Sequence, residues 1–84
     1  MATKRSTGLR RPRHPMPADV RDALMDAGLW DAYQARPPYQ RNDYVGWITR
    51  AKRTDTRLRR LAQMLNELAA GDRYMKMVYT PRGP

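Results

Sequence analysis

The sequence contains no cysteine and only one histidine, His14, among its 84 residues. Without thiols the chain can form neither disulfide bonds nor thiolate zinc ligands. A lone imidazole does not assemble a metal site or a Ser-His or Cys-His nucleophile system. We therefore expect no metal and no cofactor, and we expect His14 to be a solvated residue of a tail rich in proline and arginine.

Long apolar runs, glycine-rich loops and paired acids are also missing. No apolar run is long enough to cross a membrane, and none follows the charged N-terminus as in a secretory signal. We expect a cytoplasmic protein without membrane insertion. The five glycines are scattered, so no phosphate-binding loop is present, and the eight acidic residues form no inward-facing pair for hydrolysis. Enzymatic activity is not expected.

Basic residues outnumber acidic ones by 17 to 8, which gives a formal net charge of +9. Residues 1–15 form a basic arm without any acid, and its glycine and proline breaks predict a disordered segment. Such an arm fits contact with an anionic polymer or surface, or serves only for solubility. The sequence leaves both open. The cations of the arm are Lys4, Arg5, Arg10, Arg11 and Arg13.

Apolar residues recur at helical spacing between residues 16 and 71 and predict one small domain. Pro17 suits a first helical position, and Gly28 and Gly71 suit helix ends. Thr54 is the expected cap of the last and longest helix. The fold class is all-α, a small bundle of about four helices, one of them short. The predicted helices cover residues 17–27, 29–35, 39–52 and 54–70.

The predicted core consists of the apolar face of each helix. Gly46 interrupts the third helix at a cost of about 1 kcal/mol relative to alanine. We expect this glycine to allow close approach of a neighbouring helix or of a bulky ring such as Trp30. The predicted core residues are Val20, Ala23, Leu24, Ala27, Leu29, Trp30, Tyr33, Tyr44, Trp47, Ile48, Ala51, Leu58, Leu61, Ala62, Leu65, Leu68 and Ala69.

The C-terminal tail, residues 72–84, has five apolar residues within positions 74–79. A polar disordered tail would not carry them, so we expect this segment to dock on the bundle or on a partner. Side chains alternate between the two sides of an extended segment, which places Met75, Met77 and Tyr79 together.

A dense group of cations surrounds the joint between the third and fourth helices. In one interpretation it is a solvated helix surface paired with Asp43, Asp55 and Glu67, where each exposed pair contributes about 0.2–1 kcal/mol. In the other, the guanidinium groups form a ridge that binds phosphate. The solvated surface is slightly favoured because arginine is also a good helix former. The candidate binding surface comprises Arg50, Lys52, Arg53, Thr56, Arg57 and Arg60.

The pattern Tyr44-Val45-x-Trp47-Ile48-x-x-Ala51-Lys52, followed by Thr56-Arg57-x-x-Arg60, resembles the YdeI/OmpD-associated (bacteriocin-protection) family. The resemblance covers about residues 16–70. It implies a small α-helical module, often found beside a β-rich domain, that is linked to porin expression and bacteriocin tolerance without a defined mechanism. The chain departs from the family at Tyr39, where such sequences usually place a serine cap before the third helix.

Two functions follow from these observations. The first is a monomeric, non-catalytic binding module of this family, with a protein partner that the sequence does not identify. The alternative is a nucleic-acid-associated protein, in which the arm and residues 50–60 bind the phosphate backbone. Salt dependence separates them, because phosphate binding weakens steeply with salt.

Overall fold

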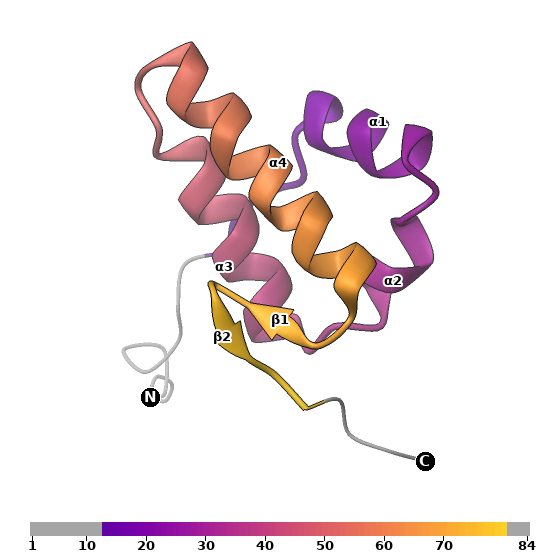
Figure 1. Cartoon of the computed structure of the whole chain (residues 1–84). Coiled ribbons are helices and arrows are strands. Elements are labelled where there is room, and N and C mark those ends of the chain that lie inside the picture. Colours follow the sequence, from indigo (N-terminus) through magenta and orange to yellow (C-terminus); the bar gives the residue numbers. More distant parts are fainter. Residues whose placement is uncertain (1–12, 81–84) are drawn as a thin grey trace, which may run out of the picture.

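The computed structural model describes residues 13–80, and within that range four helices surround one core while a two-stranded hairpin closes one end (Figure 1). The predicted all-α bundle with one short helix is confirmed. The predicted arm lies outside the described residues except for its last three, residues 13–15. The elements are α1 (Ala18–Asp26), α2 (Trp30–Gln34), α3 (Pro38–Thr49), α4 (Thr54–Ala70), β1 (Arg73–Tyr74) and β2 (Met77–Val78).

The turn between α1 and α2 is a glycine-terminated helix end, as expected. Gly28 adopts a left-handed φ of +70° and donates its N–H to the carbonyl of Met25 at 3.0 Å. Leu29 donates its N–H to the carbonyl of Leu24 at 2.9 Å. This pair of bonds satisfies two carbonyls that a helix end leaves open. It also turns the chain so that α2 packs beside α1 (Figure 1).

Helix α3 differs from its prediction at both ends. It begins at Pro38, with Pro37 as the extended residue before it, so Tyr39 is a helical residue and not the cap. It ends at Thr49 and not at Lys52. The Thr49 hydroxyl donates to the carbonyl of Val45 at 2.8 Å. The N–H of Ala51 donates to the carbonyl of Ile48, three residues earlier, and this bond closes the last turn. A longer α3 would leave too few residues to reverse the chain into α4.

The prediction that Thr54 caps α4 is wrong, although the predicted helix itself is confirmed. Thr54 already has helical geometry, the extended residue before it is Arg53, and no side chain caps the N-terminus. Asp55 instead accepts the N–H of Thr56 at 2.8 Å, which satisfies one free N–H of the first turn. At the other end Gly71 adopts a φ of +86° and terminates α4, as predicted.

The buried face of α4 is rotated from its predicted position by about one residue, which is ~100° around the helix axis. Leu58 is 58% exposed, and Ala62 and Ala69 are exposed as well, so these core predictions are wrong. Met64 is fully buried in their place. The buried core is Val20, Leu24, Tyr33, Tyr44, Val45, Ile48, Met64 and Leu68.

The hairpin packs on the bundle, and it corrects the expected extended segment, because the chain reverses at Met75 and Lys76. Its strands pair antiparallel, with Tyr74 opposite Met77. The ring of Tyr74 lies edge-on to Tyr44 at 5.4 Å, and its hydroxyl binds Asp43 at 2.7 Å. Met75 and Lys76 at the turn have φ values of 51° and 65°. Two left-handed residues are typical of tight hairpin turns but cost energy in residues other than glycine or asparagine.

The residues before α1 pack against α3, and this corrects two expectations. The N–H of His14 donates to the side-chain carbonyl of Asn42 at 2.8 Å, and His14 is half-buried rather than solvated. Its imidazole lies on Gly46, where a Cβ atom would come within 2.6 Å of Nε2. The ring that Gly46 accommodates is therefore His14 and not Trp30. Sequence distance hid this contact, because 32 positions separate the two residues.

Candidate functional site

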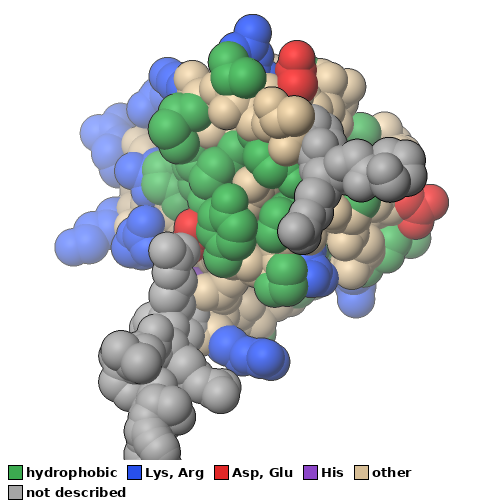
Figure 2. Space-filling model, turned by 90° about the horizontal axis from the view of Figure 1, so that it is seen from below, with side chains coloured by type: hydrophobic (Ala, Val, Ile, Leu, Met, Phe, Trp, Pro, Cys, Tyr) green, Lys and Arg blue, Asp and Glu red, His purple; other side chains and the backbone are tan. Residues whose placement is uncertain are grey.

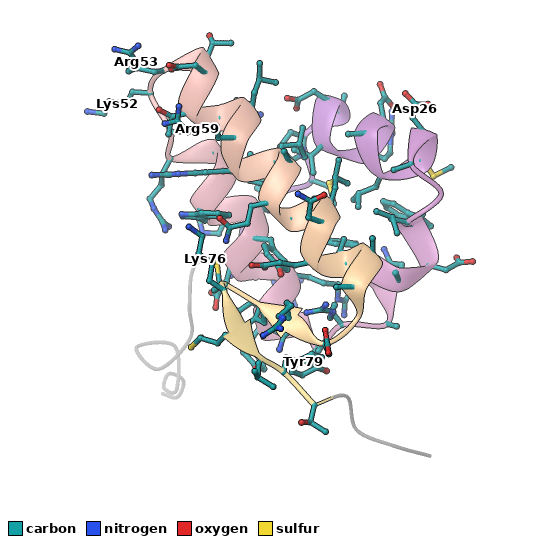
Figure 3. The ribbon with its side chains drawn as sticks, in the orientation of Figure 1. Asp26, Lys52, Arg53, Arg59, Lys76 and Tyr79 are labelled. Atoms are coloured by element: carbon teal, nitrogen blue, oxygen red, sulfur yellow. The ribbon has the colours of Figure 1, made fainter. Side chains whose placement is uncertain are left out.

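An open groove of about 660 Å³ runs between the solvent side of α4, the last turns of α3 and the hairpin turn. Arg59 from α4 and Lys76 from the hairpin project on the same side of the molecule as Lys52 and Arg53, whereas Asp26 lies on the opposite side (Figure 3). We call this open groove the basic groove. Its lining residues are Trp47, Thr56, Arg59, Arg60, Ala62, Gln63, Asn66, Glu67, Arg73 and Lys76.

Arg60 and Trp47 join α4 to α3 along the wall of the groove. The guanidinium of Arg60 lies over the Trp47 ring at 5.3 Å from its centroid. Its Nη1 donates to the backbone carbonyl of Trp47 at 2.7 Å. A cation over an indole ring is attracted by the ring quadrupole. Among residues 13–80 no carboxylate pairs with Arg60, so its charge is held in place without being neutralised.

Arg57 leaves the predicted surface. Its Nη2 and Nε bind the two carboxylate oxygens of Asp19 in α1, at 3.1 and 3.2 Å. This hydrogen-bonded pair lowers the pKa of Asp19, since the guanidinium favours the ionised carboxylate. The structure therefore separates Arg57, which connects α4 to α1, from Arg60, which faces the groove. Although Arg57 and Arg60 are one helical turn apart, they do not lie on the same surface.

The connection between α3 and α4 continues the cationic surface beyond the groove. Arg53 binds the carboxylate of Asp55 at 3.0 Å, and Arg59 lies 3.9 Å from the same carboxylate. The bond from Arg53 is the main cause that lowers the pKa of Asp55. Arg50 and Lys52 form no ion pair with any residue between 13 and 80. The exposed carboxylate of Asp55 thus pairs with two cations, and two further cations of the connection have no ion-pair partner among residues 13–80.

Glu67 forms part of the groove floor and is 6% exposed, although the sequence suggested a surface ion-pair partner. Its carboxylate accepts the Tyr44 hydroxyl, the Gln63 amide at 3.1 Å, and the backbone N–H groups of Met75 and Lys76 at 2.8 and 2.7 Å. Burial alone would raise the pKa of Glu67, but these hydrogen bonds outweigh it and lower the pKa. Burial and the bond to Glu67 both raise the pKa of Tyr44.

The hydrogen bonds to Glu67 explain the strained hairpin turn. Met75 and Lys76 hold left-handed conformations because their N–H groups both point at one carboxylate. The turn thereby fixes Lys76 at the rim of the groove, and β1 places Arg73 at the same rim. Sequence reasoning missed both the carboxylate and these two cations. One feature of the sequence could have indicated the burial of Glu67. This residue, the only glutamate of the chain, is a neighbour of Met64 and Leu68 on α4.

A second missed network lies behind the groove and is structural. Arg36 is 6% exposed, and its guanidinium donates to the side chain of Gln40 and to the backbone carbonyl of Glu67, both at 3.1 Å. It also lies over the ring of Tyr79 at 4.8 Å. A cation is favoured beside the last carbonyls of a helix such as α4. Arg36 therefore ties α2 to the end of α4 and to the segment after β2.

The positive charge of the described chain is concentrated on one side. Residues 13–80 contain twelve basic and eight acidic residues. The basic groove and the α3–α4 connection hold seven of the basic but only three of the acidic residues, Asp55, Glu67 and Asp72. The remaining five basic and five acidic residues cancel. Figure 2 shows Lys and Arg side chains gathered along the left edge of the molecule. The seven cations are Arg50, Lys52, Arg53, Arg59, Arg60, Arg73 and Lys76.

Comparison with known proteins agrees with the pattern seen in the sequence. No curated protein and no solved structure matches the chain. None of the helices between residues 13 and 80 has the length and apolar character needed to cross a membrane. The family described as bacteriocin-protection, YdeI or OmpD-associated matches residues 14–71, which include all four helices and end before the hairpin. This match covers more than half of the length of the chain. The chain therefore belongs to the bacteriocin-protection, YdeI or OmpD-associated family.

Proposed function

We propose that the chain is a non-catalytic binding module that holds an anionic partner in the basic groove. The observation that carries this proposal is the placement of charge. The whole cationic surplus of residues 13–80 lies at the groove and the adjoining α3–α4 connection. A cleft lined by one sign of charge concentrates ligands of the opposite sign and speeds their association.

The ion pairs present at the groove are of the kind that a partner displaces at little cost. The side chains of Arg53, Asp55 and Arg59 are 79%, 55% and 72% exposed. Ion pairs between side chains this exposed contribute little to stability. Guanidinium groups bind phosphate and carboxylate bidentately, so the exposed arginines suit either anion. Glu67 does not oppose such a ligand strongly, because four donors already occupy its carboxylate.

A protein partner held by apolar contacts is the second candidate, and one observation favours it. Tyr39, Met77 and Val78 are 50%, 57% and 74% exposed. They belong to the hairpin side of the molecule, where Figure 2 shows apolar side chains gathered. Binding through this surface would change little with salt, whereas binding in the basic groove weakens as salt rises.

Fluorescence anisotropy with a labelled heparin fragment at several salt concentrations tests the proposal. Arg59→Gln removes one charge from the groove, and Arg21→Gln removes one charge from α1, outside the groove lining. The two arginines are matched, since each is exposed on a helix and near one aspartate. We expect Arg59→Gln to weaken binding several-fold and to reduce the salt slope by about one.

Arg21→Gln should change both quantities little. Equal effects of the two substitutions would mean that only overall charge matters and that the groove is not the site. Binding of the wild-type protein that does not change with salt would remove the anionic partner altogether and direct attention to the apolar surface.

A further inference from the structure

The arrangement of Arg60 in the groove indicates what kind of anion fits it. Its guanidinium is planar, rests over the Trp47 ring and is fixed by the Trp47 carbonyl. Both side chains line the groove, so a flat ring entering it meets an arginine that is already oriented. Bases of single-stranded nucleic acids stack on guanidinium planes and aromatic rings in this way. Polyphosphate and polyglutamate have no ring that would use such a surface.

We propose that the basic groove binds single-stranded nucleic acid, with one base stacked on Arg60. This inference rests on the proposed function and specifies its partner. The phosphates would bind the cations on either side of Arg60, namely Arg59 on α4 and Arg73 and Lys76 on the hairpin. The base edge would face the uncharged polar side chains that line the same groove.

These uncharged side chains lie along one side of α4. Thr56 and Asn66 are ten positions apart on the helix, which is about 15 Å, and Gln63 lies between them. A side-chain amide has both donors and an acceptor, and so has the edge of each base. Among residues 13–80 no hydrogen bond engages the Asn66 amide, which is exposed in the groove. A site for simple anions would have no use for such a row.

Duplex DNA fits the same surface poorly. A recognition helix must enter the major groove, as the second helix of a helix-turn-helix protein does. On this side α4 forms the floor of a groove, with the end of α3 and the hairpin turn rising beside it. The bases of a duplex remain stacked on one another and present no free face to Arg60. Only an unpaired base can enter.

The test compares four probes of similar charge against the full-length protein: single-stranded oligo-uridylate, a duplex, polyphosphate and polyglutamate. Three proteins are used: the wild type, Arg60→Lys and the control Arg21→Lys, which changes an exposed arginine of α1 that does not line the groove. Lysine keeps the charge but lacks the planar guanidinium. Arg60→Lys should weaken oligo-uridylate binding roughly five- to 150-fold, the range for one stacked base, and leave polyphosphate binding unchanged. Arg21→Lys should change both little.

Each other outcome overturns a defined part of the account. If polyphosphate binds as tightly as oligo-uridylate, or both lysine variants behave alike, the groove recognises charge only and the stacking inference is wrong. If the duplex or polyglutamate binds tightest, the partner class is wrong while the anionic proposal stands. If no probe binds, the proposed function fails as well. Circular dichroism of Arg60→Lys confirms that a loss of binding is not a loss of fold.

Discussion

The backbone N–H of Lys76 donates to the carboxylate of Glu67 at 2.7 Å, and this contact fastens the hairpin turn to α4. The N–H of Met75 donates to the other carboxylate oxygen at 2.8 Å. One buried side chain therefore does two things: it stabilises a turn of two left-handed residues, and it places Lys76 at the rim of the basic groove. The rim of the groove therefore depends on an acid whose carboxylate already accepts four hydrogen bonds.

Glu67→Gln should destabilise the protein by about 1.5–3 kcal/mol at pH 7, because bonds to a charged acceptor are lost. The folded pKa of Glu67 is lowered, so its contribution to stability is present above the unfolded value near 4.3 and is lost as the pH falls through the folded value. The wild type should lose more stability than the variant between pH 6 and pH 3. Urea denaturation at several pH values measures both effects.

A smaller pH dependence should remain in the Glu67→Gln variant, because the pKa of Asp19 and that of Asp55 are also lowered. Equal acid sensitivity in the two proteins would show that Glu67 does not carry a stabilising charge. The docking of the hairpin on α4 would then need another explanation.

The sequence predicted the helices better than it predicted their polar contacts. Apolar periodicity located all four helices, and Gly28 and Gly71 located two ends. Periodicity placed the buried face of α4 one position away, because leucine and alanine at 58, 62 and 69 suggested a wider stripe. Three-dimensional packing selected Met64 instead.

The site was predicted only in part, and the reason is physical. Arg60 and Thr56 do line the groove, but Arg57 turns to Asp19 because α1 lies on that side of α4. Glu67 and Arg36 were missed because a charged residue is ordinarily a surface residue. Their burial depends on partners 23 to 31 positions away, which no local pattern reveals. The turn at Met75 carries no glycine or asparagine to signal it.

Gly46→Ala should displace His14 and leave α3 intact. The new Cβ would lie 2.6 Å from the imidazole, which must move, whereas alanine favours the helix by about 1 kcal/mol. We expect little net gain in the wild-type background. In a His14→Ala background the same substitution should stabilise the protein by up to about 1 kcal/mol. Thermal unfolding of the four proteins of this cycle gives the coupling, and a gain that is the same in both backgrounds would contradict the contact.

Arg57→Gln and Arg60→Gln should both affect folding, in contrast to their predicted placement on a free surface. The ion pair of Arg57 with Asp19 is partly exposed, so its loss should cost no more than about 1 kcal/mol. Loss of the Arg60 bond to the Trp47 carbonyl and of the ring contact should cost about 1–3 kcal/mol. Urea denaturation of each single variant ranks them, and a larger effect of Arg57→Gln would contradict the structure.

Trp47→Ala should destabilise the protein by less than the ~3–5 kcal/mol typical of a fully buried tryptophan, because Trp47 is only half-buried. The sequence analysis placed this ring in the core. The substitution also removes the ring beneath Arg60, so the arginine should become mobile. Thermal unfolding measures the first effect, and NMR of the Arg60 side chain the second. An unfolded Trp47→Ala protein would show that the ring contributes more to the core than its exposure indicates.

An NMR titration of the 15N-labelled protein with oligo-uridylate tests most directly whether the basic groove binds single-stranded nucleic acid. Binding in the basic groove predicts chemical-shift changes at the Trp47 indole N–H, at Thr56, at the Asn66 side-chain amide and at Lys76. The acidic side of α1 around Asp26 should stay unchanged. Shifts that appear on α1 and α2, or that spread evenly over the molecule, would contradict the account.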